Sequence, residues 1–205
     1  MKIAASILNA QNKIECIKKL NETTVDYIHI DTMDGQFVPN KTLPIDEVNE
    51  LGTITKKPFD IHLMVENPIP YINKLTVSNV NCITVHIEIK EDIDKIITLI
   101  KKRNCLVGLA INPNTDISSL NSYLDKIDKI IVMSVNPGYG GQKFINTITK
   151  KIKNIRKLTK NIIIEVDGGI NNKTIKNINN TADIAVVGSY IINYDNYQEA
   201  IDSLQ

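Results

Sequence analysis

Tyr27-Ile28-His29-Ile30-Asp31 is a short apolar run that ends on polar residues, as expected for a buried β-strand with a functional site at its end. Two further runs follow this pattern, with His62 in Phe59-Asp60-Ile61-His62-Leu63-Met64 and His86 after Ile83-Thr84-Val85. Successive strand residues point to opposite faces, so His29 and Asp31 share a face, as do His62 and Met64. If these strands lie side by side, their polar residues converge on one point the size of a metal ion.

Strands and helices alternate along the whole chain. Most of the predicted strands are continuous Ile, Val and Leu runs, typical of parallel sheets buried on both faces. These strands are Lys2–Leu8, Tyr27–Asp31, Phe59–Met64, Asn81–Val85, Leu106–Ile111, Lys129–Met133, Ile162–Val166 and Ile184–Val187. Amphipathic segments of helical period lie between them, for example Asp92–Lys102 and Phe144–Leu158, and Pro68 opens a third helix with Asn67 as its cap.

About eight strands with helices between them predict a single (β/α)8 TIM barrel over residues 1–205, with the active site at the C-terminal mouth of the strands. A doubly wound sheet would also alternate. It usually has fewer strands, however, and it concentrates its chemistry at one switch point, whereas here polar residues recur at nearly every strand end.

Length, charge and cysteine content limit the classes of partner that the chain can have. A chain of 205 residues fits one domain, and 24 Lys and Arg against 23 Asp and Glu give no strong field for nucleic acid or an anionic membrane. No apolar run approaches a membrane span, and the first eight residues are too short and too soon polar for a signal peptide. We therefore expect a cytoplasmic protein with a small-molecule partner.

Cys16, Cys82 and Cys105 lack disulfide or zinc spacing and are interpreted as small hydrophobic residues.

Two long segments, His29–Asn40 (HIDTMDGQFVPN) and Val132–Phe144 (VMSVNPGYGGQKF), resemble the signatures of the ribulose-phosphate 3-epimerase family. Shorter matches extend the resemblance over almost the whole barrel: Ser6-Ile7-Leu8, His62-Leu63-Met64-Val65, His86-Ile87-Glu88, Asn112-Pro113-Asn114-Thr115, Glu165-Val166-Asp167-Gly168-Gly169-Ile170 and Val187-Gly188-Ser189. The resemblance implies an isomerase of the pentose phosphate pathway that interconverts D-ribulose 5-phosphate and D-xylulose 5-phosphate.

The resemblance also implies one divalent metal ion held by His29, Asp31, His62 and Asp167. Two imidazoles and two carboxylates suit zinc or iron first, and also manganese or cobalt, so the metal stays open. By the same resemblance Asp31 accepts the proton and Asp167 donates one on the opposite face of a flat enediolate. His86 matches none of the family's metal ligands, and we expect it to support a ligand or to pack.

Substrate contacts follow from glycines and from the resemblance. Glycine lets backbone amides approach a phosphate closely, and glycines follow the sixth, seventh and eighth predicted strands. The loop of residues 138–141 is also a candidate lid. The predicted contacts are Ser6, His62, Gly138, Tyr139, Gly140, Gly141, Asp167, Gly168, Gly169, Gly188 and Ser189, and the predicted apolar wall beneath the enediolate is Met33, Met64 and Met133.

Some positions depart from the family pattern, among them Ala5, Gln11, Thr32 and Gln36, and they leave the sugar preference open. One alternative is a 3-epimerase of another ketose phosphate such as D-allulose 6-phosphate. A phosphate-binding barrel decarboxylase would need an Asp-x-Lys-x-x-Asp array, where this chain has residues 60–65 as DIHLMV. A phosphosugar-binding protein on an inactive barrel would have lost a key Asp or His, and none is lost. The predicted partners are a small phosphosugar and further copies of the chain in a homo-oligomer, without nucleic acid or membrane.

Overall fold

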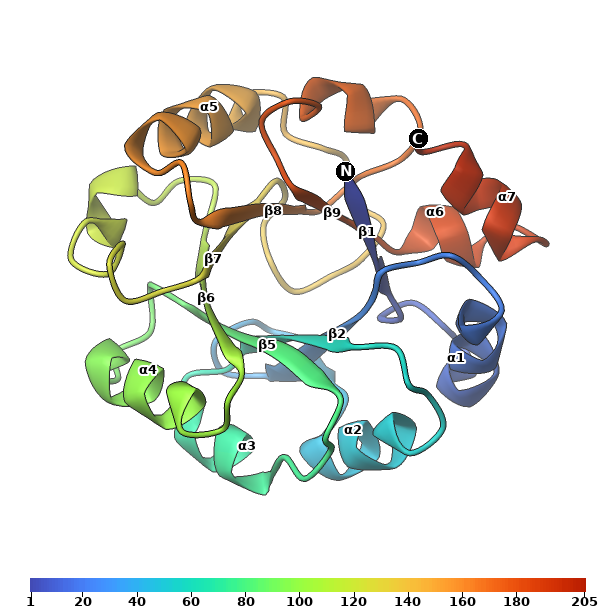
Figure 1. Cartoon of the computed structure of the whole chain (residues 1–205), viewed down its shortest axis with the longest axis horizontal. Coiled ribbons are helices and arrows are strands. Elements are labelled where there is room, and N and C mark those ends of the chain that lie inside the picture. Colours follow the sequence, from blue (N-terminus) through green and yellow to red (C-terminus); the bar gives the residue numbers. More distant parts are fainter.

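A closed ring of parallel strands forms the centre of the computed structural model, which describes all 205 residues (Figure 1). In spatial order the ring consists of β1 (Lys2–Ser6), β2 (Tyr27–Asp34), β4 (Phe59–Met64), β5 (Val80–His86), β6 (Leu106–Ile111), β7 (Lys129–Met133), β8 (Ile163–Asp167) and β9 (Ile184–Val187). Pairing of β1 with both β2 and β9 closes the ring. The predicted single (β/α)8 TIM barrel is therefore confirmed.

Helices surround the ring on its outside (Figure 1). The α-helices are α1 (Lys13–Asn21), α2 (Ile45–Gly52), α3 (Ile69–Lys74), α4 (Ile93–Lys101), α5 (Ile148–Leu158), α6 (Ser189–Ile192) and α7 (Tyr197–Asp202). Two crossovers carry short 3₁₀-helices instead, η1 (Ile117–Leu120) and η2 (Thr174–Asn177). Asp92 caps α4 by accepting a hydrogen bond from the backbone N–H of Lys95, and the helix buries Ile93, Ile96, Ile97 and Ile100 against the ring.

The element bounds differ from the sequence prediction in a few places. β2 continues to Asp34 because Met33 and Asp34 pair with the added antiparallel strand β3 (Lys41–Thr42). β1 ends at Ser6, where the chain turns and the N–H of Ala10 donates to Ile7 O. α5 starts at Ile148 rather than at Phe144, because the preceding residues belong to the loop after β7. None of the helices combines the length and the apolar composition that a membrane span requires.

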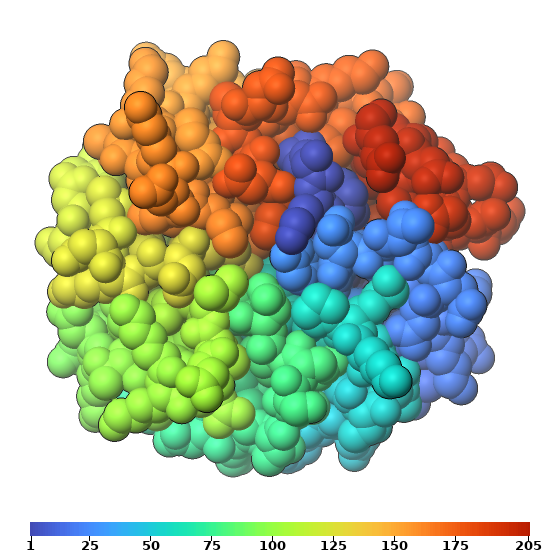
Figure 2. Space-filling model, viewed as in Figure 1, coloured from blue at the N-terminus to red at the C-terminus, as the bar shows by residue number.

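The alternation of strand side chains divides the interior into two parts. The outward-facing residues, such as Ile30 and Val132, join the large apolar core between the ring and the helices. The inward-facing residues fill the ring, which looks open between the ribbons and is filled by side chains in the space-filling view (Figure 2). This inner set is unusually polar, and its fully buried members include Asp60, Lys129 and Glu165.

No disulfide forms, and Cys16 and Cys82 are buried, as their interpretation as small hydrophobic residues predicts.

Candidate active site

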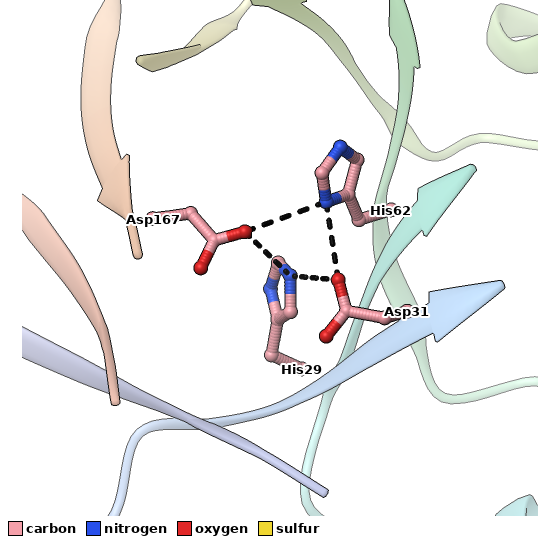
Figure 3. Close-up of side chains that lie close together, drawn as sticks. All are labelled: His29, Asp31, His62 and Asp167. Atoms are coloured by element: carbon pink, nitrogen blue, oxygen red, sulfur yellow. Dashed lines mark hydrogen bonds and ion pairs between the residues drawn. The ribbon is translucent and has the colours of Figure 1, made fainter. Parts of the chain in front are cut away.

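Four polar side chains meet near the carboxyl ends of three strands (Figure 3). His29 and Asp31 share one face of β2, and the strand register places His62 of β4 directly beside Asp31. Asp167 is the last residue of β8 and points at them from the opposite side of the ring. One donor atom from each of the four residues lies within 4.8 Å of all the others, so the cluster can surround a single ion.

Only one of the nitrogen–oxygen contacts within the cluster, between His62 Nδ1 and Asp31 Oδ1, is a hydrogen bond. His29 Nε2 lies 3.3 Å from Asp31 Oδ1 and 4.0 Å from Asp167 Oδ2. His62 Nδ1 lies 3.2 Å from Asp31 Oδ1 and 3.6 Å from Asp167 Oδ2. His29 Nε2 is buried and has no hydrogen-bond partner, which is rare for a buried polar atom. An unpartnered imidazole nitrogen aimed at two carboxylates fits the donor set of a divalent transition metal.

The charges of His29, Asp31 and His62 depend on one another. Burial opposes ionisation of Asp31, but the nearby His29 and His62 outweigh it and hold the pKa of this carboxyl well below its usual range. Burial likewise opposes protonation of both imidazoles, and the neighbouring carboxylates still raise the pKa of His29 and of His62. A metal ion would compete with protons for Nε2 of His29 and Nδ1 of His62, so metal binding should strengthen as the pH rises.

A second layer of charge lies deeper in the ring, behind His29. His29 Nδ1 lies 2.9 Å from Asp60 Oδ2 and 3.3 Å from Glu165 Oε1. The ammonium of Lys129 contacts Asp60 and lies 2.6 Å from Glu165 Oε2. Burial lowers the pKa of Lys129, yet Asp60 and Glu165 more than compensate and raise it well above its usual value. Asp60 thus hydrogen-bonds the back of the His29 ring, Glu165 lies beside it, and the ammonium of Lys129 partly balances the negative charge of the two carboxylates.

Sequence reasoning did not single out these three inner residues. Asp60 stands two positions before His62, Glu165 two before Asp167, and Lys129 four before Met133. Even spacing places each of them on the inward face of its strand. The sequence signal that could have revealed them is a charged residue at an inward position of an otherwise apolar strand.

His86 lies behind the other imidazole. Its Nε2 is 2.9 Å from His62 Nε2, and its Nδ1 is 3.0 Å from Glu88 Oε2. Burial, opposed by the hydrogen bond to Glu88, lowers the pKa of His86 to about 4. His86 is not among the residues that surround the candidate metal position, and its expected role, to support a ligand or to pack, stays a prediction.

A cavity of about 390 Å³ opens above the cluster at the carboxyl ends of the strands. Asp31 and Asp167 reach it, whereas His29 and His62 are fully buried and do not line it. Of the other predicted contact and wall residues, the cavity is lined by Ser6, Met33, Met64, Met133, Gly138, Tyr139, Gly140, Gly141, Gly168, Gly169, Gly188 and Ser189. A direct substrate contact of His62 stays a prediction. The hydroxyl of Ser6 donates to Asp31 Oδ2 over 2.8 Å and so orients that carboxylate.

The glycine-rich loop after β7 covers one side of this cavity. Asn40 Nδ2 donates to Gly138 O over 2.9 Å, which connects this loop to the loop after β2. Gly169 has a φ of +65°, and a Cβ there would lie 2.4 Å from the backbone N of Phe144, so only glycine lets the two loops meet. Sequence reasoning missed Asn9, which also lines the cavity and donates through Nδ2 to Ser189 Oγ over 2.8 Å.

Comparisons with known proteins agree with the sequence signatures. A model of the Ribulose-phosphate 3 epimerase family matches residues 2–192. The ribulose-phosphate 3-epimerase of Bacillus subtilis (strain 168) is 35% identical over 216 residues, covering 100% of this chain and 98% of that protein. That of Helicobacter pylori (strain J99) is 33% identical, covering 100% and 97%. In structure, 3-hexulose-6-phosphate synthase from Salmonella typhimurium superposes with a TM-score of 0.72 at 16% identity over 100% of this chain and 96% of that one, a likeness of fold.

Proposed function

We propose that this chain, which belongs to the ribulose-phosphate 3-epimerase family, interconverts D-ribulose 5-phosphate and D-xylulose 5-phosphate at the cavity above its His/Asp cluster. The observation that carries the proposal is the pair of carboxylates, Asp31 from β2 and Asp167 from β8, which both reach the cavity from different sides of the ring. Inversion at a carbon beside a ketone requires two such groups, because the proton leaves one face and returns to the other.

His29, Asp31, His62 and Asp167 would hold one divalent metal ion, with His29 Nε2 and His62 Nδ1 as the imidazole donors. When bound, such an ion supplies positive charge that stabilises the negative oxygens of an enediolate. Zinc and iron are our first candidates, and manganese and cobalt suit the same donors. The unpartnered Nε2 of His29 supports this assignment.

The two aspartates would exchange the protons. Asp31 is ionised because its pKa is depressed, so it can accept the proton from C3, and Ser6 keeps its carboxylate in place. Asp167 would deliver a proton to the opposite face, and the roles exchange in the reverse direction. Met33, Met64 and Met133 line the cavity and would limit the access of water to the enediolate.

The phosphate would lie among the glycines of the loops after β7, β8 and β9. In barrels of this kind the loops after the last two strands commonly bind phosphate. Here Gly168, Gly169, Gly188 and Ser189 supply these loops, and all four line the cavity. Backbone amides rather than lysine side chains would then carry the recognition.

The test is NMR of D-ribulose 5-phosphate with the protein in heavy water. We expect D-xylulose 5-phosphate to form with deuterium at C3, activity to disappear after chelation while the circular dichroism spectrum is retained, and activity to return with zinc or iron. D-allulose 6-phosphate is assayed in parallel, and faster turnover of that sugar would correct the substrate. Full activity in demonstrably metal-free protein would refute the metal assignment. The homo-oligomer stays a prediction, which light scattering can check.

A further inference from the structure

A chain of polar contacts connects the candidate metal site to the loop after β6. It runs from His62 through His86 to Glu88, with 2.9 Å between the two Nε2 atoms and 3.0 Å between His86 Nδ1 and Glu88 Oε2. The second oxygen of Glu88, Oε1, accepts from the N–H of Asn112 over 2.8 Å and from Thr115 Oγ1 over 2.6 Å. Every atom along this path has a partner.

The protons along the path can be placed from the donors and acceptors alone. A carboxylate only accepts, so His86 Nδ1 must carry a hydrogen toward Glu88 Oε2. A neutral His86 then has a bare Nε2, which can only accept, so the hydrogen between the two rings belongs to His62 Nε2. Nδ1 of His62 lies 3.2 Å from Asp31 Oδ1, at hydrogen-bond distance, and 3.6 Å from Asp167 Oδ2, so without metal it can donate a hydrogen to Asp31. A metal ion would take the place of that hydrogen and bind the Nδ1 lone pair, while the hydrogen on Nε2 stays directed toward His86.

We propose that His86 and Glu88 are positioning residues that hold His62 in its Nε2–H tautomer and so present the Nδ1 lone pair to the metal. The inference rests on the proposed metal site. It assigns His86 and Glu88 a defined task, which is to fix the polarity of the hydrogen-bond chain. A ligand's outer partner commonly fixes its tautomer in this way.

The packing around this path keeps its geometry fixed. The rings of His62 and His86 lie nearly parallel, with their Nε2 edges facing each other and their centroids 5.0 Å apart, and Phe37 packs on His86 with a centroid distance of 4.7 Å. Both imidazoles are fully buried and are therefore shielded from water. Lys151 Nζ donates to the carbonyl oxygens of Asn112 (2.6 Å), Pro113 (3.2 Å) and Thr115 (2.5 Å), and thereby holds the loop that holds Glu88.

The substitution Glu88→Gln directly tests the direction of the hydrogen bonds along the path from His62 through His86 to Glu88. Glutamine can keep one oxygen for Asn112 and Thr115 and would then turn its NH₂ group toward His86. His86 Nδ1 would have to accept, its Nε2–H would point at His62, and His62 would carry its hydrogen on Nδ1, facing the metal position. Glu91→Gln is the matched control, because Glu91 is exposed and lies in the same loop three residues later.

Two measurements decide the matter, and the chain has only three histidines to assign. The ¹⁵N chemical shifts of the histidine rings should show hydrogen on His86 Nδ1 in wild type and in Glu91→Gln, and on His86 Nε2 in Glu88→Gln. Zinc affinity of Glu88→Gln, measured by competition with a chelator, should fall ~10–100-fold relative to Glu91→Gln.

A wild-type spectrum with the hydrogen on His86 Nε2 would overturn the proposal, even if Glu88→Gln failed to fold. Zinc affinity in folded Glu88→Gln within about twofold of the control, which is smaller than the usual effect of a ligand's outer partner, would overturn it as well. Neither measurement uses a sugar. A protein with the expected tautomer and zinc affinity but no epimerase activity would therefore refute the proposed function and leave this inference standing.

Discussion

Lys129→Met should strongly destabilise the barrel, because it removes the only lysine from a buried cluster of charges. The Lys129 side chain is 2% exposed, and it contacts Asp60 and Glu165, which are 3% and 0% exposed. At the 2.6 Å between Nζ and Glu165 Oε2, the attraction is about 6 kcal/mol with an effective dielectric constant of 20. Desolvation offsets much of this gain. Removing the lysine alone, however, leaves two buried carboxylates without it, and such losses typically cost ~3–5 kcal/mol of the free energy of unfolding.

Urea unfolding of metal-free protein at neutral pH, followed by circular dichroism, measures this loss. Lys126→Met is the matched control, since Lys126 is a partly exposed surface lysine paired with Asp94 and should cost no more than ~1 kcal/mol. Adding Glu165→Gln to Lys129→Met should recover part of the stability, because one uncompensated charge disappears. A loss in Lys129→Met no larger than that of the control would show that the cluster does not need its ammonium, and the reasoning would be wrong.

Three further outcomes follow from the site and from the packing of α7. Asp31→Asn and Asp167→Asn should each lower turnover beyond the ~10²–10⁴-fold typical of acid–base groups, because metal affinity also suffers; near wild-type rates in both metal-loaded variants would exclude their proton roles. Gly188→Val should raise KM for the phosphosugar, because a Cβ there lies 3.4 Å from Ser6 Cβ beside the cavity; an unchanged KM would place the phosphate elsewhere. Burial raises the pKa of Tyr197 from 10.0, its value in the unfolded chain, to about 12 in the folded protein. The contribution of this shift to the free energy of unfolding is therefore fully present below pH 10 and is lost as the pH rises toward about 12. Alkaline unfolding curves should show that decline, and Tyr197→Phe should flatten it.

The barrel could be predicted because most of its strands are nearly continuous apolar runs, which are typical of a sheet buried on both faces, and because amphipathic helical segments alternate with them. The prediction of the bounds of β4, β6, β7 and β9 is confirmed residue for residue. β3 could not be found, since a two-residue strand has no periodicity and forms only because it meets the end of β2. The 3₁₀ crossovers were missed for a similar reason, because each is only four residues long.

Some contacts of the candidate site could likewise be predicted from the sequence, and others could not. His29 and Asp31 are two positions apart, so their shared face could be predicted from strand geometry alone. The contact of Lys129 with Asp60 joins residues 69 positions apart, and its sequence signal, a lysine at the start of an apolar strand, names no partner. The 2.9 Å contact between His62 and His86 depends on side-chain rotamers as well as on register, and the sequence specifies neither directly.

The closure of the ring through β1 has a consequence for synthesis on the ribosome. β1 is made before every other strand of the ring, yet its partner β9, residues 184–187, is made after all of them. Until those residues emerge, the nascent barrel has an open sheet edge with unpaired N–H and C=O groups, a surface on which other chains can aggregate. Asp167 also emerges late, so the nascent chain carries three of the four candidate ligands long before the fourth. Folding to the closed ring should therefore await synthesis of β9, binding of the proposed metal should await Asp167, and a ribosome stalled before β9 should carry an incomplete barrel with this edge exposed.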